Sequence, residues 1–179
     1  MNLSLNTGEG TSRTRWIAQT GLFLALAIAL PVGLHAFGIG GRVFLPMHLP
    51  VLLAGFIVGP VSGLVVGILA PGVSHLITGM PPTYAVPLMS LELPLYGLVA
   101  GLAYNRLRLN IYIALIAAMM VGRLMFGLGL VVLGLFIDLP YNATVFFSAA
   151  GPLVAGLPGI AIQLVLIPII VAAVQRSRT

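Results

Sequence analysis

The sequence predicts an all-α membrane protein of six transmembrane helices with both termini in the cytoplasm. Of its 179 residues, 60% are hydrophobic and 6% are charged, and the mean hydropathy is +1.16. A chain this apolar cannot face water on all sides. Its apolar residues lie in long runs separated by short polar loops, and nearly all of its arginines lie in those loops or near the chain ends. Long apolar runs indicate helices, because a helix satisfies its own backbone groups in lipid.

The chain divides into one membrane domain and two short polar ends. We expect residues 1–15 to form a polar N-terminal tail, residues 16–175 a transmembrane domain, and residues 176–179 a cytoplasmic tail. The tail is expected to be disordered over 1–12. The formal net charge of +5 comes from arginines that lie mostly between apolar runs. This placement indicates orientation in a membrane rather than binding to nucleic acid.

Six apolar runs are interpreted as membrane spans. In chain order they are residues 16–37, 46–58, 61–78, 83–104, 111–137 and 143–174. The first run is too long for the hydrophobic region of a signal peptide, so we interpret it as a retained span. The last run is expected to bend at its prolines, Pro152, Pro158 and Pro168.

Residues 46–82 are too long for one span and short for two. A hydrocarbon core of about 30 Å needs about 20 residues at 1.5 Å each. Gly59 and Pro60 divide the run, and proline suits the first position of a helix. We therefore expect a hairpin whose first helix is short and shielded by other helices. The pair is expected to pack through the glycines at every fourth position, Gly55, Gly59, Gly63 and Gly67.

The arginines orient the six spans. With six crossings, only Arg42 falls in a loop on the side opposite the termini. The positive-inside rule then places both termini in the cytoplasm and leaves loops 38–45, 79–83 and 138–142 outside. The arginines on the cytoplasmic side are Arg13, Arg15, Arg106, Arg108, Arg176 and Arg178.

Two charged residues lie inside predicted spans, Glu92 in the fourth and Arg123 in the fifth. A charge within a membrane is costly, so it marks either pairing or function. Glu92 and Arg123 either form a structural ion pair or line a polar cavity open to the outside. In the second case, Arg123 would hold a carboxylate or phosphate of a ligand. The pair could also serve both roles, if a ligand competes with one of the two residues for the other.

Three histidines lie near the predicted outer ends of spans, His35, His48 and His75. The hairpin would place His48 and His75 at similar depth. Histidines alone are a weak metal signal, since a closed zinc site takes four ligands. We expect hydrogen bonding to a ligand by at least one of them, and no metal.

Other polar side chains flank the same outer face. Tyr84, Tyr141 and Asn142 are candidates for ligand contact, although aromatic residues at this depth also form interfacial belts. Gln163 is expected in the cytoplasmic half of the last span, where an interhelical hydrogen bond is favoured over a ligand contact.

The familiar catalytic and nucleotide-binding motifs are absent. The sequence has no GxxxxGK[ST] loop, no HExxH and no GxSxG, and only three acidic residues. We therefore expect no enzyme activity and no cofactor, and this chain cannot hydrolyse ATP alone.

Several stretches resemble the substrate-binding S component of energy-coupling factor (ECF) vitamin transporters, and the resemblance covers about residues 16–175. In the first span it rests on the AxxxA pattern of Ala25 and Ala29. The longer stretches are PMHLPVLLAGFIVGP, SHLITGMPP, LELPLYGLVAGLAYN with Glu92, and VGRLMFGL with Arg123.

This resemblance implies an S-component-like bundle in a prokaryotic cell membrane, with a pocket in its outer half capped by the loop at residues 38–45. It implies capture of a vitamin or related micronutrient, and partnership with a T component and two ATPase subunits. Ala25 and Ala29 would contact the T component. The bundle would topple in the membrane to release the ligand inward.

The predicted site follows from both lines of argument. Arg123 is expected to anchor an anionic group, with Glu92 as its partner or as an acceptor for the ligand. Asn2 stands where the nickel and cobalt branch of the family has a histidine, which counts against a metal ion as the ligand. The ligand is instead expected to be anionic, for example pantothenate-like. Secondary positions are His48, His75, Tyr84 and Asn142.

Two other functions stay open. One is a stand-alone, proton-coupled transporter of a small solute, with Glu92 as the proton site. The other is a structural membrane subunit in which Glu92 and Arg123 only pair.

Overall fold

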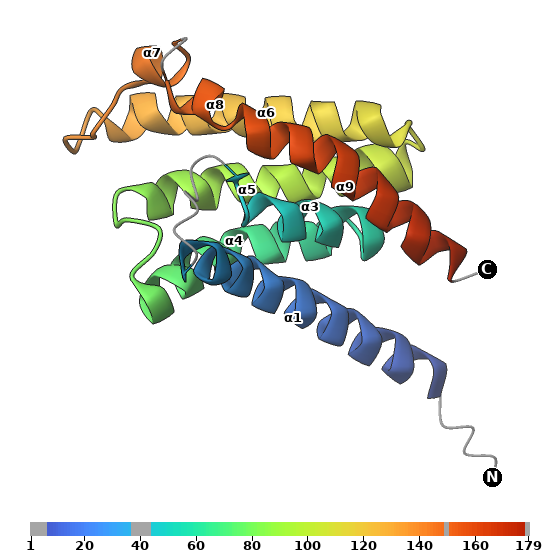
Figure 1. Ribbon diagram of the computed structural model, residues 1–179. Coiled ribbons are helices and arrows are strands. Elements are labelled where there is room, and N and C mark those ends of the chain that lie inside the picture. Colours follow the sequence, from blue (N-terminus) through green and yellow to red (C-terminus); the bar gives the residue numbers. More distant parts are fainter. Residues whose placement is uncertain (1–6, 37–43, 149–150, 178–179) are drawn as a thin grey trace.

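The protein is a bundle of helices, and the computed structural model describes residues 7–36, 44–148 and 151–177. Among these residues, five helices are long and apolar enough to cross a membrane, and a shorter apolar helix, α3, joins them. The predicted all-α membrane fold is confirmed. A sixth crossing of the membrane would have to be made by α3, which has 10 residues. The elements are α1 (Thr7–Ala36), α3 (His48–Ile57), α4 (Pro60–Thr78), α5 (Ala85–Gly101), the π-helix η1 (Leu102–Arg106), α6 (Ile111–Leu133), α7 (Ala143–Phe146), α8 (Pro152–Ala155) and α9 (Leu157–Arg176) (Figure 1).

The predicted hairpin is present as α3 and α4. Gly59 has a φ of 128°, which L side chains rarely adopt, and Pro60 begins α4. The Gly59 amide donates to the Ala54 carbonyl at 3.1 Å, which closes the end of α3. Most of α3 is buried, so the expectation that neighbouring helices shield this short helix is confirmed.

The spaced glycines bring the hairpin against α5. A Cβ added to Gly63 would lie 2.6 Å from the Gly97 Cα, and one on Gly101 would lie 2.6 Å from the Pro60 Cα. The nearest atoms to Gly55 also belong to Gly97. The expectation that the glycines form a packing surface holds, but that surface faces a third helix, and Gly59 serves the turn. Only the absence of side chains allows the backbones to approach this closely.

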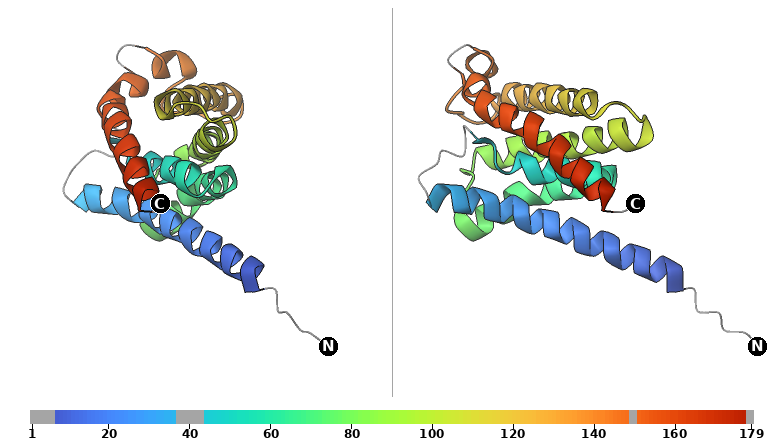
Figure 2. Two further views of the ribbon diagram at one scale, coloured as in Figure 1. Left: turned by 90° about the vertical axis from the view of Figure 1, so that its right-hand side faces the viewer. Right: turned by 45° about the vertical axis from the view of Figure 1, so that its right-hand side comes forward.

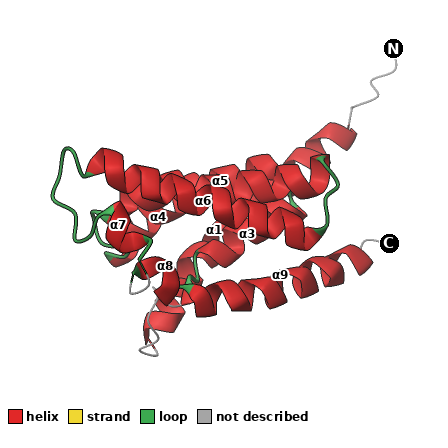
Figure 3. Ribbon diagram, turned by 90° about the horizontal axis from the view of Figure 1, so that it is seen from above, coloured by secondary structure: helices red, strands yellow, loops and turns green. Residues whose placement is uncertain are grey.

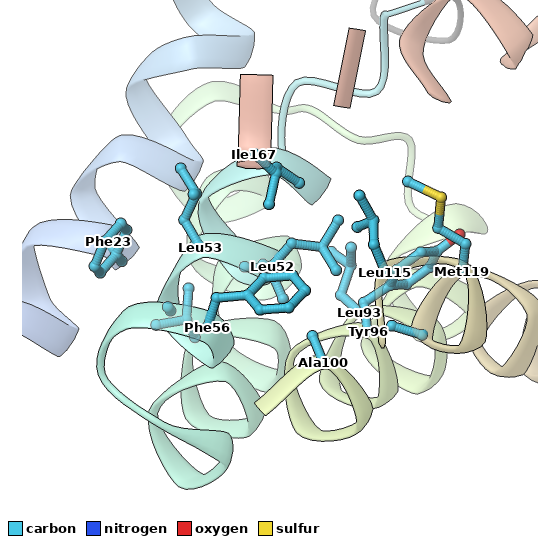
Figure 4. Close-up of a cluster of buried hydrophobic side chains, with 14 of the residues drawn as sticks. Phe23, Leu52, Leu53, Phe56, Leu93, Tyr96, Ala100, Leu115, Met119 and Ile167 are labelled. Atoms are coloured by element: carbon cyan, nitrogen blue, oxygen red, sulfur yellow. The ribbon is translucent and has the colours of Figure 1, made fainter. Parts of the chain in front are cut away.

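The apolar core lies where α1, α3, α4, α5, α6 and α9 meet (Figure 4). Between α1 and α4, the Thr20 and Ser62 hydroxyls are 2.9 Å apart and buried. Asn105, which lies just outside the predicted fourth span, donates from Nδ2 to the Gly55 carbonyl at 3.1 Å. This bond satisfies a backbone carbonyl near the end of α3. The residues drawn and labelled in the figure are Phe23, Leu52, Leu53, Phe56, Leu93, Tyr96, Ala100, Leu115, Met119 and Ile167.

The first helix is longer than predicted and packs through one narrow face. It begins at Thr7, so residues 7–15 of the expected polar tail are helical. No proline interrupts this segment, and each added helical residue gains a backbone hydrogen bond. The amino-terminal half of α1 projects away from the bundle in both views of Figure 2. Its buried residues recur at helical spacing, at Thr20, Phe23, Ala27 and Pro31.

The expectation of one bent span over residues 143–174 is wrong. That segment contains α7 and α8 before the long helix α9 starts at Leu157. Pro152 lies in the first turn of α8 and Pro158 in the first turn of α9, where a missing amide hydrogen costs nothing. Two of the three prolines therefore start helices, and Pro168 lies inside α9.

The arrangement of the ends agrees with the predicted topology. The amino-terminal end of α1 and the carboxyl-terminal end of α9 lie on the same side of the bundle as the connection between α5 and α6 (Figure 3). That connection carries Arg106 and Arg108. Of the predicted outer loop at 38–45, residues 38–43, with Arg42, lie outside the described residues.

Candidate functional site

The structure holds a cavity of 540 Å³. The elements that line it include the connection between α4 and α5 and the segment around α7 and α8, which lie at the end of the bundle opposite the chain termini (Figure 3). Its wall is formed by Pro31 of α1, the start of α3, Ser74 of α4, the connection between α4 and α5, the helices α5 and α6, and the segment around α7 and α8. Its volume falls within the usual range for small-molecule sites. The lining residues are Pro31, Leu45, Pro46, Met47, His48, Ser74, Met80, Pro81, Pro82, Tyr84, Ala85, Met89, Glu92, Arg123, Phe126, Tyr141, Phe146 and Pro152.

Three helices bring Glu92, Arg123 and His48 together at the wall of this cavity. Arg123 Nη1 on α6 lies 2.9 Å from Glu92 Oε1 on α5. His48 Nε2, at the first residue of α3, lies 3.6 Å from Glu92 Oε2, which is longer than a hydrogen bond. The exposed fractions are 1% for Glu92, 9% for Arg123 and 3% for His48. The two intramembrane charges therefore pair, and they do so in the cavity.

Several polar atoms of this cluster have no hydrogen-bond partner among the described residues. Within the described part of the chain, Arg123 Nε and Nη2 and both ring nitrogens of His48 are buried without a hydrogen-bond partner. Burying such atoms unpaired costs about 1–3 kcal/mol each, more for charged groups. A molecule that enters the cavity and pairs with them would recover this free energy.

The rest of the wall is mostly apolar and aromatic. The rings of Phe126 and Phe146 are stacked with centroids 4.7 Å apart, and Tyr141 is nearly parallel to Phe146 at 6.4 Å. The Arg123 guanidinium lies 5.9 Å from the Phe146 ring centroid. The Phe146 ring beside the cation lowers the local dielectric constant, which strengthens the attraction of Arg123 for an anion.

The connection between α4 and α5 is held over the cavity by residues at the end of α4. Ser74 Oγ donates to the Met80 carbonyl at 2.8 Å, and His75 Nδ1 lies 2.8 Å from the Pro81 carbonyl. Thr78 Oγ1 accepts from the Met80 amide at 3.1 Å. Met80 and Pro81 line the cavity, so these bonds set the shape of one wall.

The predicted secondary positions divide into two groups. His48 and Tyr84 line the cavity, whereas His75 and Asn142 are not among its lining residues. His75 contacts the Pro81 carbonyl instead. Asn142 caps α7, where its Oδ1 accepts from the Val145 amide at 2.9 Å. A polar residue just before a helix is a capping signal, and the sequence carried that signal here.

Several lining residues were not predicted. Met89 lies three residues before Glu92, and Phe126 lies three residues after Arg123. Residues at this spacing share a helix face, so the two charges could have pointed to them. The sequence carried no such indication for Phe146, because residues 143–174 were predicted to form one helix and the turn between α7 and α8 was not expected.

Gln163 lies elsewhere than expected. It is near the start of α9, in the half of the bundle that contains the cavity, and its Nε2 donates to the Leu45 carbonyl at 3.4 Å. Gln163 lies there because α9 begins at Leu157, whereas the predicted span began at residue 143. Its hydrogen bond runs to the segment before α3, so the expected bond between two helices is not the one observed.

The small-residue strip of α1 is not used for packing within the described chain. Ala25 and Ala29 are exposed, and a Cβ added to Gly21 or Gly33 would meet no atom within 4 Å. The strip therefore does not pack against the other described helices of this protein.

This fold and cavity define a class of protein: a multi-pass membrane protein with a small-molecule-sized cavity at one end of a helical bundle. A family model described as "ECF transporter, substrate-specific component" matches residues 15–171. The chain belongs to this family. Comparison with curated proteins and with solved structures found no match.

Membership makes the chain a substrate-binding membrane subunit of an ECF importer, located in the cell membrane. It also implies T and ATPase components as partners, and a small molecule as the substrate.

Proposed function

We propose that this chain captures a vitamin or related micronutrient from outside the cell, with the cavity at Arg123 and Glu92 as its binding site. The unfilled donors Nε and Nη2 of Arg123, in a cavity of 540 Å³, carry this proposal. A planar guanidinium with two free donors matches a carboxylate or phosphate. The substrate is therefore an anionic micronutrient, of which a pantothenate-like molecule is one example.

Glu92 acts as the partner that holds Arg123 in place and as an acceptor for the ligand. His48 and Tyr84 contribute further contacts, since both line the cavity. His75 acts indirectly through the Pro81 carbonyl, and Asn142 through the start of α7. The exposure of Ala25 and Ala29 supports a contact between α1 and the T component.

The test is ligand binding to purified protein with Arg123→Lys. Lysine keeps a cation beside Glu92 but lacks the planar set of donors. Hydrogen bonds to charged groups contribute about 1.5–3 kcal/mol, so the affinity for the ligand that co-purifies, identified by mass spectrometry, should fall at least roughly tenfold.

The matched control is Arg108→Lys, in the exposed connection between α5 and α6, which should bind as the wild type does. Undiminished affinity in Arg123→Lys would contradict the anchoring role. Uptake that needs neither T component nor ATPase subunits would instead favour the stand-alone transporter.

A further inference from the structure

A groove lies at the end of the bundle that carries the chain termini. It has a volume of 640 Å³ and is formed by the amino-terminal half of α1, the last residue of α3 with the turn after it, and Ser177 just after α9. It opens where α1 projects away from the other helices (Figure 2). None of the described residues that line it also lines the cavity at Arg123. This groove, which we call the α1 groove, is therefore a separate site.

One part of the wall of the α1 groove is apolar and the rest is polar. Ile57 and Val58 form the apolar part. The polar lining residues supply N–H and O–H groups, and none of the described residues that line the groove is acidic. These polar residues are Ser12, Arg15, Trp16, Gln19 and Ser177. The groove thus suits a molecule that carries an anionic, hydrogen-bond-accepting group beside an apolar part.

Arg15 carries the positive charge of the groove. The ion pairs that the described residues form are those of Glu92 with Arg123 and with His48. Arg15 is therefore without a carboxylate partner in this part of the chain. A guanidinium with no counter-ion, beside a wall that is partly apolar, attracts a phosphate group, which can accept hydrogen bonds from two of its N–H groups at once.

The groove lies at the level of the lipid headgroups. Arg15 directly precedes Trp16, where the apolar run of α1 begins, and tryptophan is enriched at the boundary between lipid and water. The arginines at this end place it in the cytoplasmic leaflet. A phospholipid has its phosphate at this depth and its acyl chains just below, where Ile57 and Val58 offer an apolar wall. A free phosphate ion would leave that wall uncovered.

The T component does not account for this groove. Its proposed contact is the exposed strip of Ala25 and Ala29. Ala25 follows Trp16 by nine residues, which at about 3.6 residues per turn is about two and a half turns. The two residues therefore face opposite sides of α1, and a helix that packs on the strip does not fill the groove.

We propose that the α1 groove binds an anionic phospholipid of the cytoplasmic leaflet, with the phosphate at Arg15 and Trp16 and an acyl chain along Ile57 and Val58. The bound lipid bridges segments that are far apart in the sequence, and it ties the projecting half of α1 to the end of α3. This site does not depend on the ligand of the cavity at Arg123, so the two proposals can fail separately.

The test measures lipid binding to the purified full-length protein by native mass spectrometry. Dioleoyl phosphatidylglycerol and dioleoyl phosphatidylcholine have the same acyl chains and differ in headgroup charge. The wild type should prefer the first, and Arg15→Gln should lower this preference at least roughly fivefold, because it removes a charge-assisted contact. Arg15→Lys keeps the charge and should retain most of the preference. Glutamine and lysine are both good helix formers, so both variants should fold.

The matched control is Arg108→Gln, which removes an exposed arginine from the connection between α5 and α6 at the same end of the bundle. It should keep the wild-type preference, and an equal loss in both glutamine variants would overturn the proposal in favour of a general attraction to positive charge. Displacement of phosphatidylglycerol by equimolar glycerol 3-phosphate would contradict it by showing that phosphate alone is recognised. Unchanged lipid preference in Arg15→Gln, together with loss of co-purification with the T component, would assign the groove to that subunit instead.

Discussion

At the scale of single residues, Arg123 and Glu92 are a pair that the fold does not fully satisfy. Removing ions from water costs several kcal/mol for each ion, and a buried pair offsets this only with good geometry and further hydrogen bonds. Here Arg123 Nε and Nη2 lack such further bonds among the described residues. The pair therefore contributes little to stability, while the loss of one partner would cost about 3–5 kcal/mol by leaving the other unpaired.

His75 offers a test of how the cavity wall is held. His75→Ala removes the contact to the Pro81 carbonyl, and a hydrogen bond contributes about 0.5–1.5 kcal/mol. If the wall moves, affinity for the co-purified ligand should fall roughly two- to tenfold in calorimetry. His75→Asn retains an N–H group near the position of Nδ1 and should restore most of it. Equal affinities in the wild type and His75→Ala would show that the wall does not depend on this bond.

At the scale of elements, α5 is the helix against which α3, α4 and α6 pack. It contacts the hairpin through Gly97 and Gly101, and it carries Glu92 into the cavity. Close backbone packing fixes how α5 is shifted and rotated relative to α3 and α4. A small shift would bring side chains into the space between the glycine backbones of these helices. The position of the Glu92 carboxylate is thus set by glycines that follow it on the same helix, Gly97 and Gly101.

Gly97→Ala tests this packing. The added Cβ would overlap the backbone of Gly63, so the helices must separate, and overpacking of this kind costs about 1–3 kcal/mol. The midpoint of thermal unfolding in detergent should fall. Gly72→Ala on α4 is the matched control, since its Cβ would meet nothing within 4 Å, and it should be as stable as the wild type or slightly more stable. Unchanged stability in Gly97→Ala would refute the close contact.

The exposed strip of α1 is tested by enlarging it. Ala25→Leu with Ala29→Leu adds bulk to a surface that is exposed in the described chain. Thermal stability and ligand affinity should stay close to wild type, whereas co-purification with the T component should be largely lost, because small residues allow close helix approach in lipid. Ala161→Leu, on an exposed position of α9, should assemble normally. Normal assembly of the double variant would place the T-component contact elsewhere.

At the scale of the whole molecule, the two ends of the bundle differ in character. The end opposite the chain termini holds the cavity and its stacked rings, while the larger apolar core joins six helices. Along α6 the exposed side chains are apolar, for example Leu124 at 63% and Leu128 at 54% exposed. Such a surface is suited to lipid and carries no charge that would resist movement of the bundle within the membrane.

Single cysteines in this cysteine-free chain test the orientation. Thr83→Cys, in the connection between α4 and α5, should react with an impermeant maleimide on intact cells. Leu107→Cys, in the connection between α5 and α6, should react only after permeabilisation, since its neighbours Arg106 and Arg108 favour the cytoplasm. The reverse pattern would invert the topology and place the cavity on the cytoplasmic side.

The sequence by itself determined the membrane class, the hairpin turn and the two charges that meet in the cavity. These features depend on local chemistry: apolar run length, the restricted backbone of Gly59 and Pro60, and the cost of a charge in lipid. The resemblance in its motifs pointed to the family that the comparison then established.

Only the tertiary structure decided which polar residues face the cavity. His75 and Asn142 have the same chemistry as cavity residues, yet one holds a loop and the other caps a helix. It also decided that the glycines face α5 and that the last predicted span is divided before α9. The physical reason is that composition specifies what a side chain can bind, whereas the packing of helices distant in sequence specifies what lies beside it.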